Sequence, residues 1–67
     1  MRYEGLKKVF FEIRYKNRDY IVLYIDQGEV WKIKCECIES GNYETWEARK
    51  RYRPTYSNSL EIIKDTF

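Results

Sequence analysis

The chain has 67 residues, with 13 basic and 11 acidic side chains and a formal net charge of +2. This length predicts one small domain, residues 1–67, and leaves no room for a second. A charge so close to balance excludes a generic polycation. The absence of histidine removes the commonest general base and a common metal ligand. We therefore expect a binding protein rather than an enzyme, without a cofactor or a metal.

Four stretches of the chain alternate apolar and polar residues, which predicts β-strands. The turns between them are expected at Asn17–Arg18, Gln27–Gly28 and Ser40–Gly41, the last with a four-residue loop as an alternative that keeps the register. Two of these turns place glycine where the backbone needs a positive φ. Residues 1–6 are expected to extend the first strand or to form a frayed arm. The sequence thus predicts a mainly β fold, a four-stranded antiparallel meander with strands at about 7–15, 19–26, 29–38 and 43–53.

The turn positions also predict how the strands pair. Tyr24 is expected opposite Trp31, and Cys35 opposite Trp46. Because side chains alternate between the two sides of a strand, these registers gather most of the large aromatic residues on one side of the sheet. We call this side the aromatic face; it comprises Val9, Phe11, Ile13, Tyr15, Tyr20, Val22, Tyr24, Trp31, Ile33, Cys35, Cys37, Trp46, Ala48 and Tyr52.

The opposite side of the predicted sheet is divided into an apolar early half and a charged late half. Residues 20–25 of the second strand are apolar on both sides, which is typical of a central strand that is covered on both faces. The apolar half consists of Phe10, Ile21, Leu23, Ile25 and Val30.

Pro54 is expected to end the sheet because proline cannot donate a backbone hydrogen bond. The segment that follows, about 59–67, has two interpretations. Apolar residues at helical spacing favour a short helix capped by Ser57 or Ser59. The β-branched pair Ile62–Ile63 instead favours a fifth strand, which would close a small barrel of SH3-like or OB-like type. In either case, we expect the segment to cover the apolar half of the opposite side.

The two cysteines, Cys35 and Cys37, lie two residues apart on one strand and point to the same face. Neighbours at this spacing are roughly 6.5–7 Å apart, which is too far for an unstrained disulfide. Without histidine, the pair cannot complete a tetrahedral zinc site within one chain. We expect reduced packing cysteines or, as the alternative, a metal or disulfide site shared across a dimer.

No stretch reads as a signal peptide or reaches the ~20 apolar residues of a membrane helix. We therefore expect a cytoplasmic protein without a membrane partner. The high share of Lys, Ile, Tyr, Phe and Asn is typical of AT-rich genomes, including those of bacteriophages. For a phage-encoded protein, the compartment would be the host cytoplasm.

One short terminal segment can cover one face of a four-stranded sheet, but not two. The aromatic face is therefore either the core of the protein or, in substantial part, an interface with a partner or a second copy. The candidate interface residues are Phe11, Tyr20, Tyr24, Trp31, Trp46 and Tyr52.

A basic strip is predicted on the back of the last two strands. Such a strip can contact phosphates, with nearby tyrosines stacking on unpaired bases, or it can contact an acidic protein surface. Lysine and arginine are also common on solvated edge strands, where they prevent sheet-to-sheet pairing. The strip comprises Lys32, Lys34, Arg49, Arg51 and Arg53.

Together these features favour a small non-catalytic protein that occupies a protein or nucleoprotein partner. It would act as an inhibitor or adaptor of the kind that phages and mobile elements encode. A β-sheet module that binds nucleic acid directly is the first alternative, and a structural homodimer subunit is the second.

Overall fold

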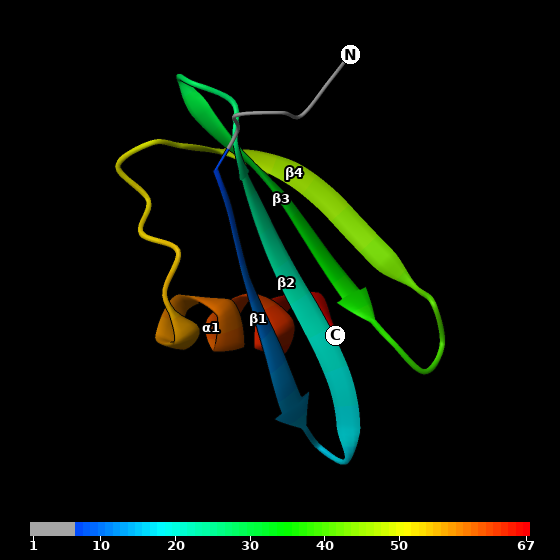
Figure 1. The fold of residues 1–67 in the computed structure, drawn as a ribbon. Coiled ribbons are helices and arrows are strands. Elements are labelled where there is room, and N and C mark those ends of the chain that lie inside the picture. Colours follow the sequence, from blue (N-terminus) through cyan, green and yellow to red (C-terminus); the bar gives the residue numbers. More distant parts are fainter. Residues whose placement is uncertain (1–6) are drawn as a thin grey trace.

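The computed structural model describes residues 7–67, so the expectation for residues 1–6 lies outside the described residues. Four antiparallel strands form one sheet in the order β1-β2-β3-β4, and a helix follows them (Figure 1). The predicted meander is confirmed, and the sheet is open rather than closed into a small barrel. The elements are β1 (Lys8–Tyr15), β2 (Arg18–Asp26), β3 (Val30–Cys37), β4 (Tyr43–Arg49) and α1 (Tyr56–Thr66).

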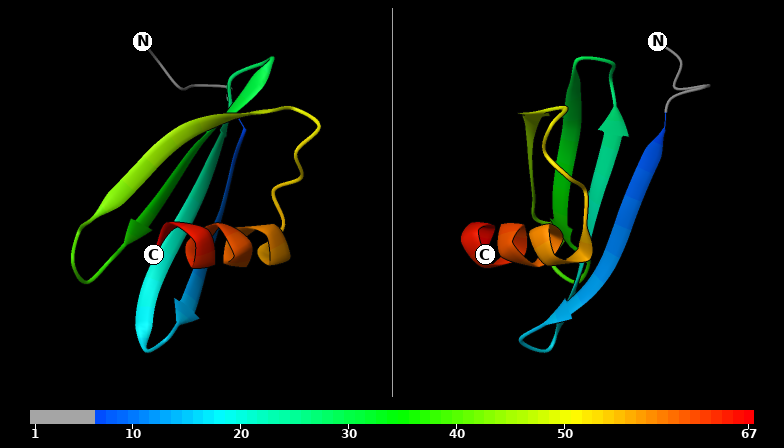
Figure 2. Two further views of the ribbon diagram at one scale, coloured as in Figure 1. Left: turned by 180° about the vertical axis from the view of Figure 1, so that it is seen from behind. Right: turned by 90° about the vertical axis from the view of Figure 1, so that its left-hand side faces the viewer.

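The molecule has two layers, the sheet and the helix. Figure 2 shows α1 lying across one face of the sheet, at an angle to the strands. The other face carries no further layer among residues 7–67. We call this second side the outer face, because it points away from the helix.

All three hairpin registers differ from the predicted ones by two residues. Tyr24 lies opposite Ile33 rather than Trp31, and Cys35 lies opposite Glu44 rather than Trp46. The first hairpin is displaced in the same way. Because each displacement is an even number of residues, every strand side chain still points to its predicted face.

The turns explain the displacement. Lys16 and Asn17 have φ values of 50° and 65°, as a type I′ turn requires at both central positions. The predicted turn at Asn17–Arg18 is therefore one residue too late. Gly28, with φ 95°, lies in the second turn, where its N–H donates to the Asp26 carboxylate at 2.8 Å. The third connection is a longer loop that includes Gly41, whose N–H donates to the backbone oxygen of Cys37 at 2.8 Å.

The hydrophobic core lies between α1 and the aromatic face. Ile63 of the helix is completely buried against the sheet. The C-terminal segment therefore covers the aromatic face, and the prediction that it covers the opposite side is wrong. The buried apolar residues are Ile13, Tyr20, Val22, Tyr24, Trp31, Ile33, Cys35, Cys37 and Ile63.

Helix α1 confirms the helical interpretation over the fifth strand, although it begins before the predicted range. Its N-cap is Thr55 rather than Ser57 or Ser59, and the Thr55 hydroxyl accepts a hydrogen bond from the Asn58 N–H at 3.1 Å. The Asn58 side chain in turn donates to the Arg53 carbonyl at 2.7 Å. These bonds fix the direction in which the helix leaves the connection. Within residues 7–67, no helix is long and apolar enough to cross a membrane.

Candidate binding surface

The structure places the predicted interface aromatics in the core of a single chain. Tyr20, Tyr24 and Trp31 are at most 8% exposed. The remaining three, which are Phe11, Trp46 and Tyr52, are half-buried and pack against that core. The aromatic face is thus the core of the protein and not a free interface.

Tyr24 is the centre of this core. Its ring makes edge contacts with Phe11 and Trp31, each at 6.4 Å between centroids, and stacks on Tyr52 at 6.2 Å. Its hydroxyl lies 2.7 Å from the Ser59 hydroxyl on the helix. Ser59 also donates to the Thr55 carbonyl at 2.7 Å, so Tyr24 acts as the donor to Ser59 in this arrangement. Burial raises the pKa of Tyr24 to about 12.

Both cysteines are free and buried, as expected for packing residues. Burial raises the pKa of Cys35 to about 11. Hydrogen bonds from the side chain and backbone of Ser40 lower the pKa of Cys37, yet its side chain is only 1% exposed. In the described part of the chain, no three Cys, Asp or Glu side chains gather as a metal site would require.

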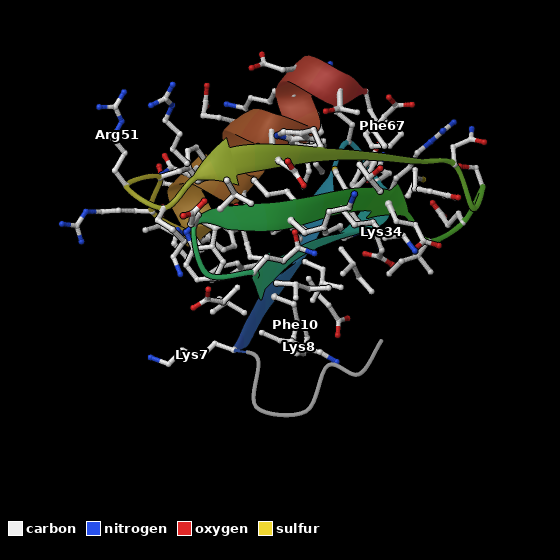
Figure 3. The ribbon with its side chains drawn as sticks, turned by 90° about the horizontal axis from the view of Figure 1, so that it is seen from above. Lys7, Lys8, Phe10, Lys34, Arg51 and Phe67 are labelled. Carbon is white, nitrogen blue, oxygen red and sulfur yellow. The ribbon has the colours of Figure 1, made fainter. Side chains whose placement is uncertain are left out.

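The predicted basic strip is divided between different parts of the molecule. β4 ends at Arg49, whereas the prediction continued it to residue 53. Arg51 and Arg53 therefore belong to the connection that leads to α1. In Figure 3, Arg51 lies at one end of the molecule, well away from Lys34 on β3. The five basic residues do not form one continuous row.

The chain leaves the sheet at Lys50, which turns toward the core. Its ammonium group lies 2.6 Å from the Asp26 carboxylate and 4.3 Å from the centre of the Trp31 ring. This contact, with the hydrogen bond from the Gly28 N–H, lowers the pKa of Asp26. This ion pair ties the connection to the β2–β3 turn, and the Tyr52 N–H donates to the Arg49 carbonyl at 2.9 Å in the turn that follows β4.

The two lysines of the predicted strip lie on the outer face beside carboxylates. Lys34 contacts Glu36 at 3.3 Å and sits 4.7 Å from the centre of the Tyr43 ring. Lys32 lies directly across from Glu47 of β4. Because carboxylates accompany both lysines, this part of the sheet has mixed charge rather than a strongly positive field.

An apolar stripe runs down the middle of the outer face. Its β2 members are half-buried by their neighbours on the sheet, whereas Phe10 of β1 is 59% exposed. Phe10 pairs directly with Leu23, and Figure 3 shows its side chain projecting on the side away from the helix. The stripe consists of Phe10, Ile21, Leu23, Ile25 and Val30.

Charges flank this stripe in an ordered way. At one end, Ile25 lies between Lys8 and Lys32. At the other end, Ile21 lies between Glu12 and Glu36. The outer face therefore has two lysines on one side of Leu23 and two glutamates on the other; Glu47 lies beside Lys32, and the ion pair of Arg14 and Asp19 lies beyond the glutamates. The sequence pattern correctly placed the apolar residues of β2 on this side. It also predicted that the C-terminal segment covers them, whereas α1 packs on the opposite side.

The helix side offers a smaller feature, a hollow of about 400 Å³ between β4 and α1. Trp46 and Tyr52 line it together with two carboxylates, those of Glu61 and Asp65. Aromatic rings and carboxylates of this kind favour cations over anions. The acidic hollow contrasts with the mixed charge of the outer face.

No protein-family model matches the chain, and neither a curated protein nor a solved structure matches it significantly. Its function has to be inferred from the surfaces of the molecule.

Proposed function

We propose that this protein is a small non-catalytic binding protein that occupies a protein or nucleoprotein partner, as an inhibitor or adaptor. The outer face of the sheet is the surface through which it binds. The observation that carries the proposal is the apolar stripe on that face, which the helix leaves uncovered because it packs on the opposite side.

The composition of the outer face fits an interface. Protein interfaces combine an apolar centre with a polar and charged rim. Here Leu23 of β2 and Phe10 of the neighbouring edge strand β1 form the apolar part, while lysines and glutamates flank it. Phe10 is more than half exposed, and aromatic side chains of this kind commonly anchor a partner by filling a pocket.

A protein surface suits this face better than bare nucleic acid. The basic residues that would contact phosphates are dispersed, and Lys34 is already paired with Glu36. Glu12 and Glu36 lie on the same face and would repel a phosphate backbone. These carboxylates favour a partner with charges of both signs around an apolar patch.

Affinity capture from a native lysate tests the proposal with two matched variants. Leu23→Lys places a charge in the middle of the stripe, whereas Ser57→Lys places the same charge on the exposed surface of the helix. We expect a partner that the wild-type protein and Ser57→Lys both retain and that Leu23→Lys loses. Nuclease treatment of a parallel sample shows whether nucleic acid mediates the capture.

Two results would contradict the proposal. A partner retained equally by Leu23→Lys would place binding elsewhere on the molecule. A wild-type protein that captures nothing and elutes as a lone 8.3 kDa monomer at all concentrations would mean that the outer face is an ordinary solvated surface.

A further inference from the structure

We infer that the outer face binds a second copy of this chain, face to face, about a two-fold axis that runs across the strands. The inference rests on the proposed function in one respect, since it uses the same surface. Because both occupants would use this face, a dimer has to separate before another partner binds there. The argument for a second copy comes from the order of charges on the face.

The strand registers arrange the outer-face side chains in rows across the sheet. The first row is Lys8, Ile25, Lys32 and Glu47. The middle row is Phe10, Leu23, Lys34 and Thr45. The third row is Glu12, Ile21, Glu36 and Tyr43.

A two-fold axis along the middle row brings the first row of one copy onto the third row of the other. Ile25 then meets Ile21 of the second copy, and Lys32 meets Glu36 of the second copy. On the axis itself, Phe10 and Leu23 each meet their own equivalents. An isologous interface of this kind makes each contact twice, so the apolar and ionic matches are both doubled.

The other in-plane axis, which runs along the strands, gives a poor match. When it passes through the middle of the sheet, between β2 and β3, it places β2 of one copy over β3 of the other. Leu23 would then face Lys34 and Ile21 would face Glu36, so that the apolar stripe would be buried against charges. The face therefore favours one of the two orientations. The cost of the favoured orientation is the approach of Lys34 to its own equivalent, which the Glu36 carboxylate at 3.3 Å partly offsets.

The size of the face is at the lower limit for a dimer. Four strands of seven to nine residues, at ~3.3 Å per residue and ~4.8 Å between strands, outline a face of roughly 500 Å², so a pair would bury about 1,000 Å² in all, at the small end of specific interfaces. Two sheets pack face to face about 10 Å apart with their strands roughly aligned. The two helices would remain on the outside of such a pair, so neither copy would need to rearrange.

The test uses two charge-reversal variants, Lys32→Glu and Glu36→Lys, and sedimentation over a concentration series. In either variant alone, both copies of the ion pair become like-charge pairs, and we expect dimerisation to weaken by roughly tenfold or more. In a mixture of the two variants, the heterodimer has two opposite-charge pairs. We therefore expect the mixture to dimerise better than either variant alone, and less well than the wild type only by the Lys34–Glu36 contact that Glu36→Lys removes from one copy.

Two controls carry matched charge changes on the helix side, where Arg51→Glu and Glu61→Lys should leave the dimer unchanged. A wild-type protein that stays monomeric throughout the series would overturn the inference. So would a dimer that both single variants retain, because that dimer would use an edge strand or the helix side. If the wild-type protein stays monomeric but captures a partner that the Leu23→Lys variant does not capture, the proposed function still holds.

Discussion

The two faces of the sheet carry similar apolar side chains from β2, but they differ in how deeply these side chains are buried. Along β2, Tyr20, Val22 and Tyr24 point to one side, and Ile21, Leu23 and Ile25 point to the other. The first set is at most 4% exposed, whereas the second is only half-buried. The difference depends on the single helix, which packs on one side and has no counterpart on the other within residues 7–67. Apolar character alone does not decide whether a side chain is buried. Burial also requires another element of the chain, here α1, to pack on that face.

The largest effect should come from the contact between the helix and the aromatic face. Ile63→Ala removes a completely buried side chain and should lower the free energy of unfolding by about 3 kcal/mol. Urea denaturation followed by tryptophan fluorescence measures this loss. If Ile63→Ala cost no more than an exposed substitution, the helix would not be the cover of the core.

Alkaline pH should lower the free energy of unfolding through Tyr24, which is buried on the same face. Below pH 10, Tyr24 carries its proton in both the folded and the unfolded chain. Between pH 10 and its folded pKa of about 12, only the unfolded chain releases the proton, so the free energy of unfolding falls as pH rises. The loss should reach about 2–3 kcal/mol by pH 12.

Tyr24→Phe removes this titration and serves as the comparison for the alkaline experiment. Its free energy of unfolding should decline less steeply above pH 10 than that of the wild type. Cys35, whose pKa is about 11, adds a decline of the same sign in both proteins. Parallel slopes for the wild type and Tyr24→Phe would show that Tyr24 titrates normally.

The hydrogen bond from Tyr24 to the helix should contribute less than the apolar contacts. Ser59→Ala leaves the Tyr24 hydroxyl buried without its partner and should cost about 1–2 kcal/mol. Thermal denaturation of Ser59→Ala, Tyr24→Phe and the double variant measures the coupling. If the two single losses simply add, the 2.7 Å contact does not couple the helix to the sheet.

The smallest effect on the folded monomer should come from the outer face. Phe10→Ala changes a side chain that is 59% exposed, and in dilute solution we expect a loss below about 0.5 kcal/mol. At high protein concentration the wild type should gain stability by dimerisation, and Phe10→Ala should gain less. Melting temperatures over a series of protein concentrations separate the effect on the monomer from the effect on the dimer. A large loss in dilute solution would show that Phe10 belongs to the core.

The sequence predicted the faces of the sheet better than its registers. Alternation with a period of two survives a displacement by two residues, so the strand residues that were predicted on a given face lie on it, even though each hairpin pairing was wrong. The turn at Lys16–Asn17 was missed because Asn17 was assigned to the first turn position and not the second. A positive φ at Lys16 carries no clear signal in the residue type itself.

The candidate site was harder to predict because it depends on contacts that are distant in sequence. No local pattern states which face a terminal helix will choose. Nor does the alternation of Arg49, Arg51 and Arg53 reveal that β4 ends at Arg49, where the Tyr52 N–H bonds back to the Arg49 carbonyl. The sequence showed that one face would lack cover. The choice of face was settled by tertiary packing.

The place of α1 in the chain also has a consequence for the order of folding. All four strands are synthesised before the helix, and the bond from Tyr24 to Ser59 joins residues that are 35 positions apart. Until that segment leaves the ribosome, the nascent sheet exposes the aromatic residues that later form the core. Pairing over such separations is slow, and exposed sheet faces aggregate. The appearance of α1 is therefore the step at which the aromatic face of a new chain becomes covered.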